Sequence, residues 1–260
     1  MFFIVIKYFF TNIFIKEQKR KGYFMAFYTF KVSKKIVSLA LFLVIVVTWV
    51  FLTPSNYDVQ VFGQYKPIYE GSKDKKIMAF TCNVAWGNEY IPPLLEIFKE
   101  KNVKATFFIE GRWAEKYPDL LKLIYDNGHE IGNHGYSHAH HAQLSYEQNL
   151  NEIKKAEQVI EDILGVKTTL FAPPYGEFSE QTVKAANSMN YRLIMWTIDT
   201  IDWKKPGVDY IVNKVLDNKG NGKIVLMHPT EDTVKAMPTI IDNLHREGFK
   251  ITTVGELLAE

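Results

Sequence analysis

Ile77-Met78-Ala79-Phe80-Thr81 is the first of seven short apolar runs of the β-strand type, and the series that it opens decides the fold. The other six runs occupy residues 105–109, 129–132, 168–171, 191–197, 223–227 and 250–253. Segments with the apolar spacing of helices separate them, at residues 92–101, 118–127, 145–164, 179–189, 208–217 and 233–247. Alternation of strands and helices predicts an α/β domain with a parallel sheet covered by helices. The number of repeats favours a (β/α) barrel, complete or incomplete, over an open doubly wound sheet.

Start signals support several of these helices. Pro92 and Pro118 each stand at the beginning of a helical segment, where proline suits the first turn. Ser145 precedes the long amphipathic segment that ends near residue 164, and Glu147 and Gln148 follow it closely enough to complete a capping box.

Length and composition set outer limits on function. The chain has 260 residues, of which 47% are hydrophobic, so it suits one α/β domain with a sizeable core and a short extra segment. A formal net charge of +2 gives no reason to expect nucleic-acid binding. Cys82 is the single cysteine, which excludes an intramolecular disulfide and a CxxC site. We expect Cys82 to be a small buried apolar residue.

The N-terminal part of the sequence predicts a membrane anchor. Residues 36–52 contain no charge and no proline, and their number lies at the lower end of the range for a spanning helix. Lys31, Lys34 and Lys35 precede this run, whereas no positive charge follows it directly. The positive-inside rule therefore predicts a cytoplasmic N-terminus and an extracytoplasmic domain, as in a single-pass protein of a bacterial cell membrane. No small-x-small cleavage pattern follows, which favours an uncleaved signal-anchor.

Residues 1–24 do not fit this arrangement, because they include a second apolar run that would reverse the orientation. We expect translation to start at Met25. The predicted organisation is a cytoplasmic N-terminus at 1–35, an anchor at 36–52, a linker at 53–75 and the α/β domain at 76–260.

Unusual polar residues follow the predicted strands. In α/β folds of either architecture, functional groups gather beyond the carboxyl ends of the strands. Five strand ends therefore direct side chains to one rim, and these side chains are Asn83, His134, Tyr175, the pair Asp199 and Asp202, and His228.

His134 and His138 are candidate metal ligands, since two imidazoles four residues apart can reach one ion from a single turn or tight loop. Imidazole with oxygen co-ligands suits zinc, and also cobalt or nickel. The alternative is a pair of surface histidines beside His140 and His141.

A second group of residues suits proton transfer. Asp202 and His228 lie at the ends of neighbouring predicted strands, where a carboxylate can orient an imidazole and raise its basicity. Such a pair can donate a proton to a leaving group, although a purely structural bond is the alternative. Trp203 and Leu226 would form an apolar wall beside it. The stiff Pro173-Pro174-Tyr175-Gly176 loop would present the Tyr175 N–H to an oxyanion.

In the order and spacing of its motifs, the stretch from Lys76 to Leu258 resembles the polysaccharide deacetylase family, also called the NodB-homology or carbohydrate esterase 4 family. The motifs concerned are His134 to His138, Pro173 to Gly176, Asp199 to Trp203, and Leu226 to His228. The resemblance implies a distorted (β/α) barrel that removes acetyl groups from N-acetylated sugars of peptidoglycan, chitin and related polymers. It also implies a divalent metal, a carboxylate base and a histidine acid.

The first motif departs from this family. Where the family has Thr-Phe-Asp-Asp, this chain has Thr-Cys-Asn-Val, so that Asn83 occupies the position of the base and Val84 that of a metal carboxylate. Ala172 replaces the arginine that pairs with the base. Because removing both partners avoids an unpaired buried charge, the changes are mutually consistent. Subgroups associated with sporulation resemble this variant.

Three functions are compatible with these residues. The first is a working de-N-acetylase, in which a metal on His134 and His138 acts with Asn83, and Glu89 is a candidate substitute base. The second is a catalytically inactive glycan-binding protein of the cell surface. It would keep the groove, with Trp86, Trp203, Leu226 and Pro174 as candidate substrate contacts. The third is a structural scaffold in an envelope complex, and no feature of the sequence specifically indicates it.

Overall fold

The computed structural model describes residues 35, 36, 38–40, 42–44 and 66–259. The chain divides into two compact units, Met1–Tyr57 and Asp58–Glu260. In the first unit the described residues are helical. Among the described residues, no helix has both the length and the apolar character needed to cross a membrane. The predictions for residues 1–34, for a start at Met25 and for most of the anchor and linker lie outside the described residues, and the anchor stays a prediction.

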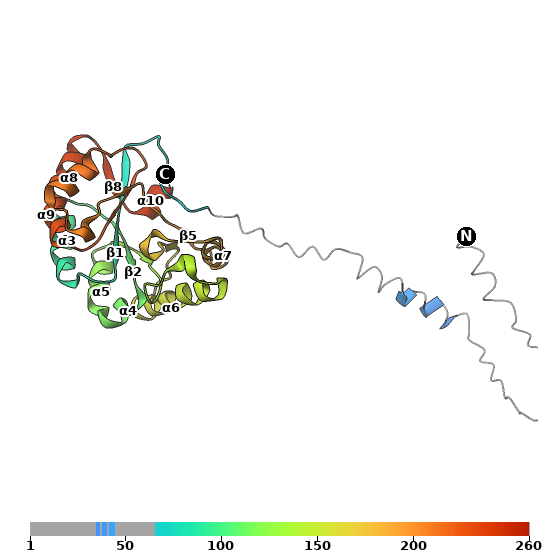
Figure 1. Cartoon of the computed structure of the whole chain (residues 1–260). Coiled ribbons are helices and arrows are strands. Elements are labelled where there is room, and N and C mark those ends of the chain that lie inside the picture. Colours follow the sequence, from blue (N-terminus) through green and yellow to red (C-terminus); the bar gives the residue numbers. More distant parts are fainter. Residues whose placement is uncertain (1–34, 37, 41, 45–65, 260) are drawn as a thin grey trace, which may run out of the picture. The chain divides into compact units, whose positions relative to one another are not determined.

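An eight-stranded parallel sheet forms the centre of the second unit (Figure 1). Seven of its strands follow the order β5-β4-β3-β2-β1-β7-β6, and β8 pairs with β1. The strands are β1 (Ile77–Val84), β2 (Thr106–Ile109), β3 (Glu130–Asn133), β4 (Leu170–Phe171), β5 (Arg192–Leu193), β6 (Ile198–Asp199), β7 (Ile224–Met227) and β8 (Lys250–Thr252). The predicted parallel sheet is confirmed.

Strand β1 is the central strand, because it pairs with three others. β7 pairs with residues 79–82 of β1. β8 pairs with residues 77–79 and β2 with residues 81–84, so these two strands follow one another along the opposite edge. All eight residues of β1 are buried. The sequence Ile77 to Val84 thus lies at the middle of the fold.

The single strand expected at 191–197 is wrong: only β5, at 192–193, lies in that range, and β6 follows it at 198–199, at the opposite end of the sheet. In a flat sheet, six spacings of about 4.8 Å would separate them by about 29 Å. The chain from Leu193 to Ile198 can span at most about 18 Å. The sheet must therefore curl until its ends approach each other. Because no described ladder joins β5 to β6, the result is a partial barrel.

Helices surround this sheet, and most lie where the sequence predicts them (Figure 1). They are α3 (Ile91–Glu100), α4 (Gly111–Lys116), α5 (Pro118–Asp126), α6 (Tyr146–Leu164), α7 (Glu180–Ser188), α8 (Val208–Leu216), α9 (Glu231–Arg246) and α10 (Val254–Ala259). Ser145 caps α6 in the predicted capping box with Gln148. The short helices α4 and α10 were not expected, since each has only six residues and too few turns to show a periodic pattern.

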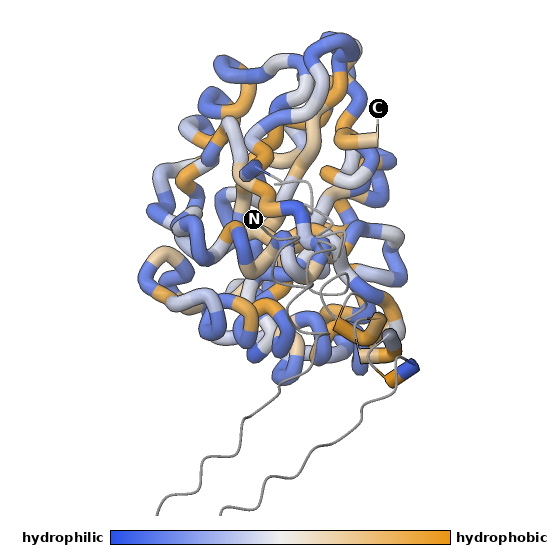
Figure 2. The backbone as a smooth tube through the Cα atoms, turned by 90° about the vertical axis from the view of Figure 1, so that its right-hand side faces the viewer, coloured by the Kyte–Doolittle hydropathy of each residue, from blue (hydrophilic) through white to orange (hydrophobic). Residues whose placement is uncertain are grey.

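Alternate residues of β1 serve two different cores. Met78, Phe80, Cys82 and Val84 belong to the cluster between the sheet and the surrounding helices, which confirms Cys82 as a buried apolar residue. Ile77 and Ala79 belong to a second cluster, which also contains β4 and β7 residues. The helices alternate between hydrophobic and hydrophilic colours, as expected when each buries one face (Figure 2). By this two-residue period, Asn83 lies on the face opposite Val84.

Candidate functional site

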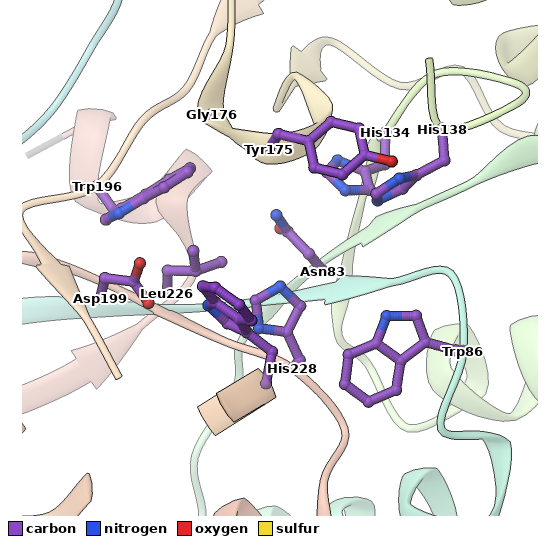
Figure 3. A pocket seen from close by; sticks show the side chains of 11 residues that line it. Asn83, Trp86, His134, His138, Tyr175, Gly176, Trp196, Asp199, Leu226 and His228 are labelled. Carbon is purple, nitrogen blue, oxygen red and sulfur yellow. The ribbon is translucent and has the colours of Figure 1, made fainter. Parts of the chain in front are cut away.

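A cavity of about 410 Å³ lies at the carboxyl ends of the strands (Figure 3). It confirms that several strands direct their end residues to one place, since side chains that follow or end β1, β3, β4, β6 and β7 line it. The lining residues are Asn83, Trp86, His134, His138, Tyr175, Gly176, Trp196, Asp199, Trp203, Leu226 and His228.

The Asn83 side chain points into this cavity from the end of β1 (Figure 3). The residue is only 5% exposed, and its Oδ1 atom is buried without a hydrogen-bond partner among the described residues. The next residue, Val84, is fully buried among the helices. The strand therefore supplies one neutral amide to the cavity and no carboxylate.

His134 and His138 lie side by side, with ring centroids 5.2 Å apart. His134 follows β3 directly, and its Nδ1 donates to the carbonyl oxygen of Ala172 at 2.6 Å. This bond fixes the tautomer and leaves Nε2 as the unprotonated nitrogen. Burial lowers the pKa of His134 well below its usual value and lowers that of His138 as well. Both rings are therefore neutral at neutral pH.

These two imidazoles do not make a three-ligand metal centre. The described residues contain no group of three or more His, Cys, Asp or Glu side chains close enough to hold one ion. Val84 stands at the position that the family resemblance assigns to a third metal ligand. Its side chain has no atom that can bind a metal, and it faces the helices. A divalent ion held by His134 and His138 stays a prediction.

The loop after β4 places Tyr175 at the edge of the cavity. Tyr175 has a left-handed backbone conformation, with φ 61°, and its N–H donates to no described residue. Its ring stacks on His140, with centroids 4.1 Å apart, and meets the edge of His138 at 4.6 Å. Pro174 is buried and does not line the cavity. The predicted donor is therefore free for a ligand, while Pro174 supports the loop from behind.

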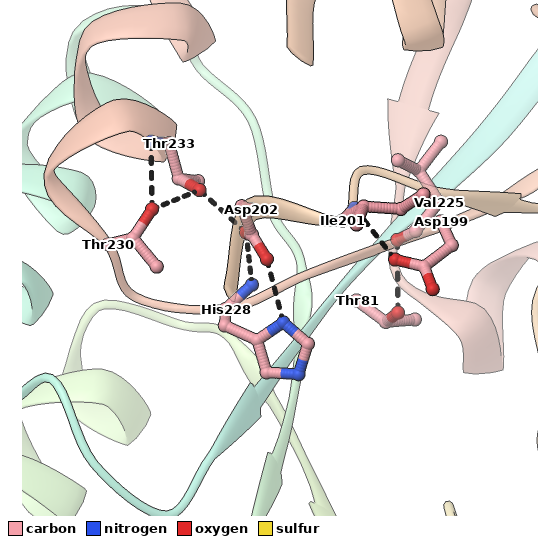
Figure 4. A network of polar contacts seen from close by, with 8 residues as sticks. All are labelled: Thr81, Asp199, Ile201, Asp202, Val225, His228, Thr230 and Thr233. Atoms are coloured by element: carbon pink, nitrogen blue, oxygen red, sulfur yellow. Dashed lines mark hydrogen bonds and ion pairs between the residues drawn. The ribbon is translucent and has the colours of Figure 1, made fainter. Parts of the chain in front are cut away.

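A polar network holds His228 at the opposite side of the cavity (Figure 4). The imidazole donates from Nδ1 to Asp202 Oδ1 at 2.8 Å, and the His228 backbone N–H donates to Oδ2 at 2.6 Å. Thr233, in α9, adds a third donor to Oδ2 at 2.6 Å. Asp202 is fully buried, so these bonds replace the water that its charge would otherwise bind. The Asp202–His228 contact predicted from the sequence is confirmed.

Trp86 covers the His228 ring from the loop after β1. The two rings are nearly parallel, at 8°, with centroids 5.7 Å apart, and Trp86 is 43% exposed. The next residue, Gly87, has φ 78°, and a Cβ there would overlap the carbonyl oxygen of Pro229. The loops after β1 and β7 can approach this closely only because Gly87 has no side chain.

Several proteins similar to this chain are described as peptidoglycan deacetylases. A family model described as polysaccharide deacetylase matches residues 70–194. A peptidoglycan-N-acetylglucosamine deacetylase of Bacillus cereus is 35% identical over 219 residues, which cover 77% of this chain and 80% of that protein. The chain belongs to the polysaccharide deacetylase family.

Two further relatives of the deacetylase domain are more similar in sequence. The uncharacterized protein YlxY of Bacillus subtilis is 41% identical over 197 residues, which are 76% of this chain and 62% of that protein. The crystal structure of a protein from Bacillus anthracis, described as a CE4 family pseudoenzyme, is 44% identical with a TM-score of 0.73. That match covers 74% of this chain and 69% of the other. A mutant of the same protein is described as having restored enzymatic activity.

At the position that the family resemblance assigns to the carboxylate base, the structure has the Asn83 amide and no carboxylate. Glu89, the candidate substitute base, lines a neighbouring cavity of about 370 Å³ that shares Trp86 and Trp203 with the first. It is not among the residues that line the cavity of Asn83.

The sequence placed Asp199 at this rim without assigning it a role, and the structure confirms its position; its Oδ1 accepts the Ile201 N–H at 2.8 Å. Trp196 is a lining residue that was not predicted. Trp196 stood inside an expected strand, where an aromatic residue is usually core. The break between β5 and β6 instead turns it toward the cavity, and nothing in its local sequence signals that turn.

Proposed function

We propose that this chain is a deacetylase-like protein that binds N-acetylated glycan of the cell wall without efficient turnover. The observation that carries the proposal is Asn83. A carboxamide does not take a proton at neutral pH, so it cannot activate water as a carboxylate base does. The loss of a general base lowers a rate by about 10²–10⁴.

The remainder of the cavity supports binding. Trp86 and Trp203 are 43% and 51% exposed, and both belong to the shared wall of the two cavities. Exposed aromatic faces in a concave site are unusual on a protein surface and suit the apolar faces of sugar rings. Tyr175, which is 55% exposed, adds a third aromatic side chain to the lining of the first cavity.

The relatives support the same proposal. One is described as a peptidoglycan-N-acetylglucosamine deacetylase, and the Bacillus anthracis neighbour as a pseudoenzyme. An inactive domain that keeps the groove fits both descriptions. The apolar run at 36–52, with lysines before it, supports a place outside the cytoplasmic membrane, in contact with wall polymer. A link to sporulation rests on the sequence resemblance alone.

Residual de-N-acetylation is a second candidate, and the Asp202–His228 network favours it. A pure binding protein has no need for an imidazole oriented by a buried carboxylate that three donors stabilise. In such a reaction His228 would protonate the departing amine, and the free Tyr175 N–H would bind the acetyl oxygen.

Binding and turnover can be measured on one sample. The full chain, kept in mild detergent, is titrated with chitotetraose by calorimetry, and acetate release is followed by NMR with and without zinc. We expect saturable binding that falls in Trp203→Ala, with acetate release at least 100-fold below that of an active family member. Acetate release within 100-fold of the rate of an active family member would establish the second candidate instead.

A further inference from the structure

Two loops at one edge of the cavity are joined by contacts between aromatic rings. The loop after β3 carries His138 and His140, and the loop after β4 carries Tyr175 and Glu177. The Tyr175 ring stacks on His140, at 8° with centroids 4.1 Å apart. It also meets the His138 ring, at 76° with centroids 4.6 Å apart (Figure 3). The Tyr175 side chain is therefore held between two imidazoles, and it lines the cavity together with His138.

His140 has a second partner on the loop that carries Tyr175. Its Nδ1 donates to Glu177 Oε2 at 2.9 Å, since a carboxylate can only accept. This bond fixes the imidazole in the orientation in which its face lies along the Tyr175 ring. Glu177 follows Tyr175 by two residues, so the hydrogen bond and the ring contact join the same two loops at neighbouring points.

Tyr175 needs such support, because its backbone conformation is unfavourable. Its φ of 61° lies in the left-handed region, which costs energy for a residue with a side chain and persists only where the surroundings hold it. The Tyr175 hydroxyl makes no hydrogen bond within the described part of the chain. The side chain is also 55% exposed. The two imidazoles thus supply contacts that the hydroxyl does not.

The contacts of His140 contribute little to the stability of the whole fold. The side chains of His140 and Glu177 are 48% and 43% exposed, and exposed ion pairs stabilise proteins only weakly. Neither residue lines either of the two cavities. Any effect of His140 on a ligand in the first cavity is therefore expected to pass through Tyr175.

We propose that His140 is a positioning residue: its stacked ring holds the Tyr175 side chain against His138 and so fixes one edge of the ligand cavity. The inference rests on the proposed glycan-binding function, and it concerns a residue outside the motifs that carry the family resemblance. Without the His140 ring, Tyr175 would be free to adopt other rotamers, and a ligand would have to order it on binding. Fixing the side chain beforehand removes that cost.

A double-mutant cycle tests this role, because it separates an effect that passes through Tyr175 from an independent one. The full chain in mild detergent is titrated with chitotetraose by calorimetry. His140→Ala should weaken binding about fivefold. In a Tyr175→Ala background the same change should alter the affinity by less than about twofold. His140→Phe keeps a stacking ring and should bind within about twofold of the wild type. His245→Ala, at an exposed position of α9, is the control.

A second measurement follows the Tyr175 ring without a ligand. In NMR spectra of the full chain with ¹³C-labelled tyrosine, the ring signal that is missing from Tyr175→Phe belongs to Tyr175. The face of the His140 ring should shift this signal upfield. His140→Ala should remove the shift, and His140→Phe should retain it. The melting temperature of His140→Ala should change by less than about 2 °C, because substitutions at exposed positions have small effects on stability.

Several results would overturn the inference. An unmoved Tyr175 signal in His140→Ala would do so whatever the titrations show. So would independent, additive losses of affinity in the double-mutant cycle, or a His140→Phe variant that binds as weakly as His140→Ala. A melting temperature lowered by more than about 4 °C in His140→Ala would indicate a structural role instead. Absence of chitotetraose binding by the wild type would overturn the proposed function, and the NMR signal would still decide whether His140 holds Tyr175.

Discussion

The Nδ1 atom of His228 lies 2.8 Å from Oδ1 of Asp202, while the face of the same imidazole is stacked on Trp86. The ring is thus fixed along its edge by a charge and across its plane by an indole. Only Nε2 remains open to the cavity, so any proton that His228 gives or takes must pass through that atom. The Asp202–His228 pair is therefore intact in a site that has the amide of Asn83 at the position of the base.

Thr233→Val tests how strongly the buried carboxylate depends on its donors. The Thr233 hydroxyl donates to Asp202 Oδ2 at 2.6 Å, and a hydrogen bond to a charged group contributes about 1.5–3 kcal/mol. We expect the free energy of unfolding in urea to fall by that amount. Thr239→Val, at an exposed position of the same helix α9, is the control. Equal effects of the two substitutions would mean that the hydroxyl of Thr233 does not stabilise Asp202.

Trp86→Ala tests the groove wall. Trp86 is shared by both cavities, and removing an exposed aromatic contact from the centre of a binding site is expected to weaken chitotetraose binding about tenfold. Calorimetry measures this change. Tyr125→Ala, an exposed aromatic of helix α5 that lines neither cavity, should leave the affinity unchanged. A similar loss in both variants would argue against a glycan groove at Trp86.

Combined substitution of Asn83→Asp, Val84→Asp and Ala172→Arg should restore acetate release in the presence of zinc by about 10²-fold or more. The related Bacillus anthracis protein, whose mutant has restored activity, supports this expectation. Because Ala172 is buried, Ala172→Arg alone should destabilise the fold by about 3–5 kcal/mol, and Asn83→Asp should recover part of that loss. A folded triple variant that binds zinc but releases no acetate would show that another defect prevents turnover.

Zinc binding is the direct test of the predicted metal site. With two imidazoles and no third ligand among the described residues, we expect the wild type to bind zinc only weakly. Calorimetry should show the binding disappear in His134→Ala and persist in His245→Ala, where the histidine is exposed on α9. Tight binding that survives His134→Ala would place the ion elsewhere.

His129 gives the fold a dependence on pH. It is 4% exposed between Phe98 and Phe107, and burial lowers its pKa to about 4, whereas an unfolded chain has about 6.5. Between these values the unfolded state binds more protons, so stability is full above pH 6.5 and falls as the pH decreases toward 4.

His129→Gln should therefore remove about 2 kcal/mol from the stability difference between pH 7 and pH 5, as measured by urea unfolding. Glutamine can still accept the Ala105 N–H that His129 Nδ1 accepts at 3.1 Å. His245→Gln, at an exposed position, is the control. An unaltered pH dependence in His129→Gln would mean that other buried histidines carry the effect.

The sequence predicted the elements whose signals are local. Ser145 and Gln148 mark the start of α6, and the apolar run from Ile77 marks β1. The meeting of Asn83, His134 and His228 in one cavity could be predicted too, because parallel strands bring their carboxyl ends to one edge.

What could not be predicted depends on curvature. The break between β5 and β6 follows from the closure of the sheet, and it turns Trp196 into the cavity rather than the core. Glu89 lies only six residues after Asn83, yet η1 (Asn88–Tyr90) carries it into the neighbouring cavity. The number of residues between Asn83 and Glu89 does not predict which cavity Glu89 lines. The direction of the loop is set by close contacts such as that of Gly87 with Pro229.

The central position of β1 has a consequence for biosynthesis. Thr81 pairs with Leu226 of β7, and Ile77 pairs with Lys250 of β8. During synthesis β1 is made well before β7 and β8, so it cannot complete its pairing until they have been made. Until residue 252 has been made, one side of β1 exposes unpaired backbone groups, which attract other chains. A chain that ends before Ile224 would lack both β7 and β8. We therefore expect nascent or truncated forms to need a chaperone until the last strand is in place.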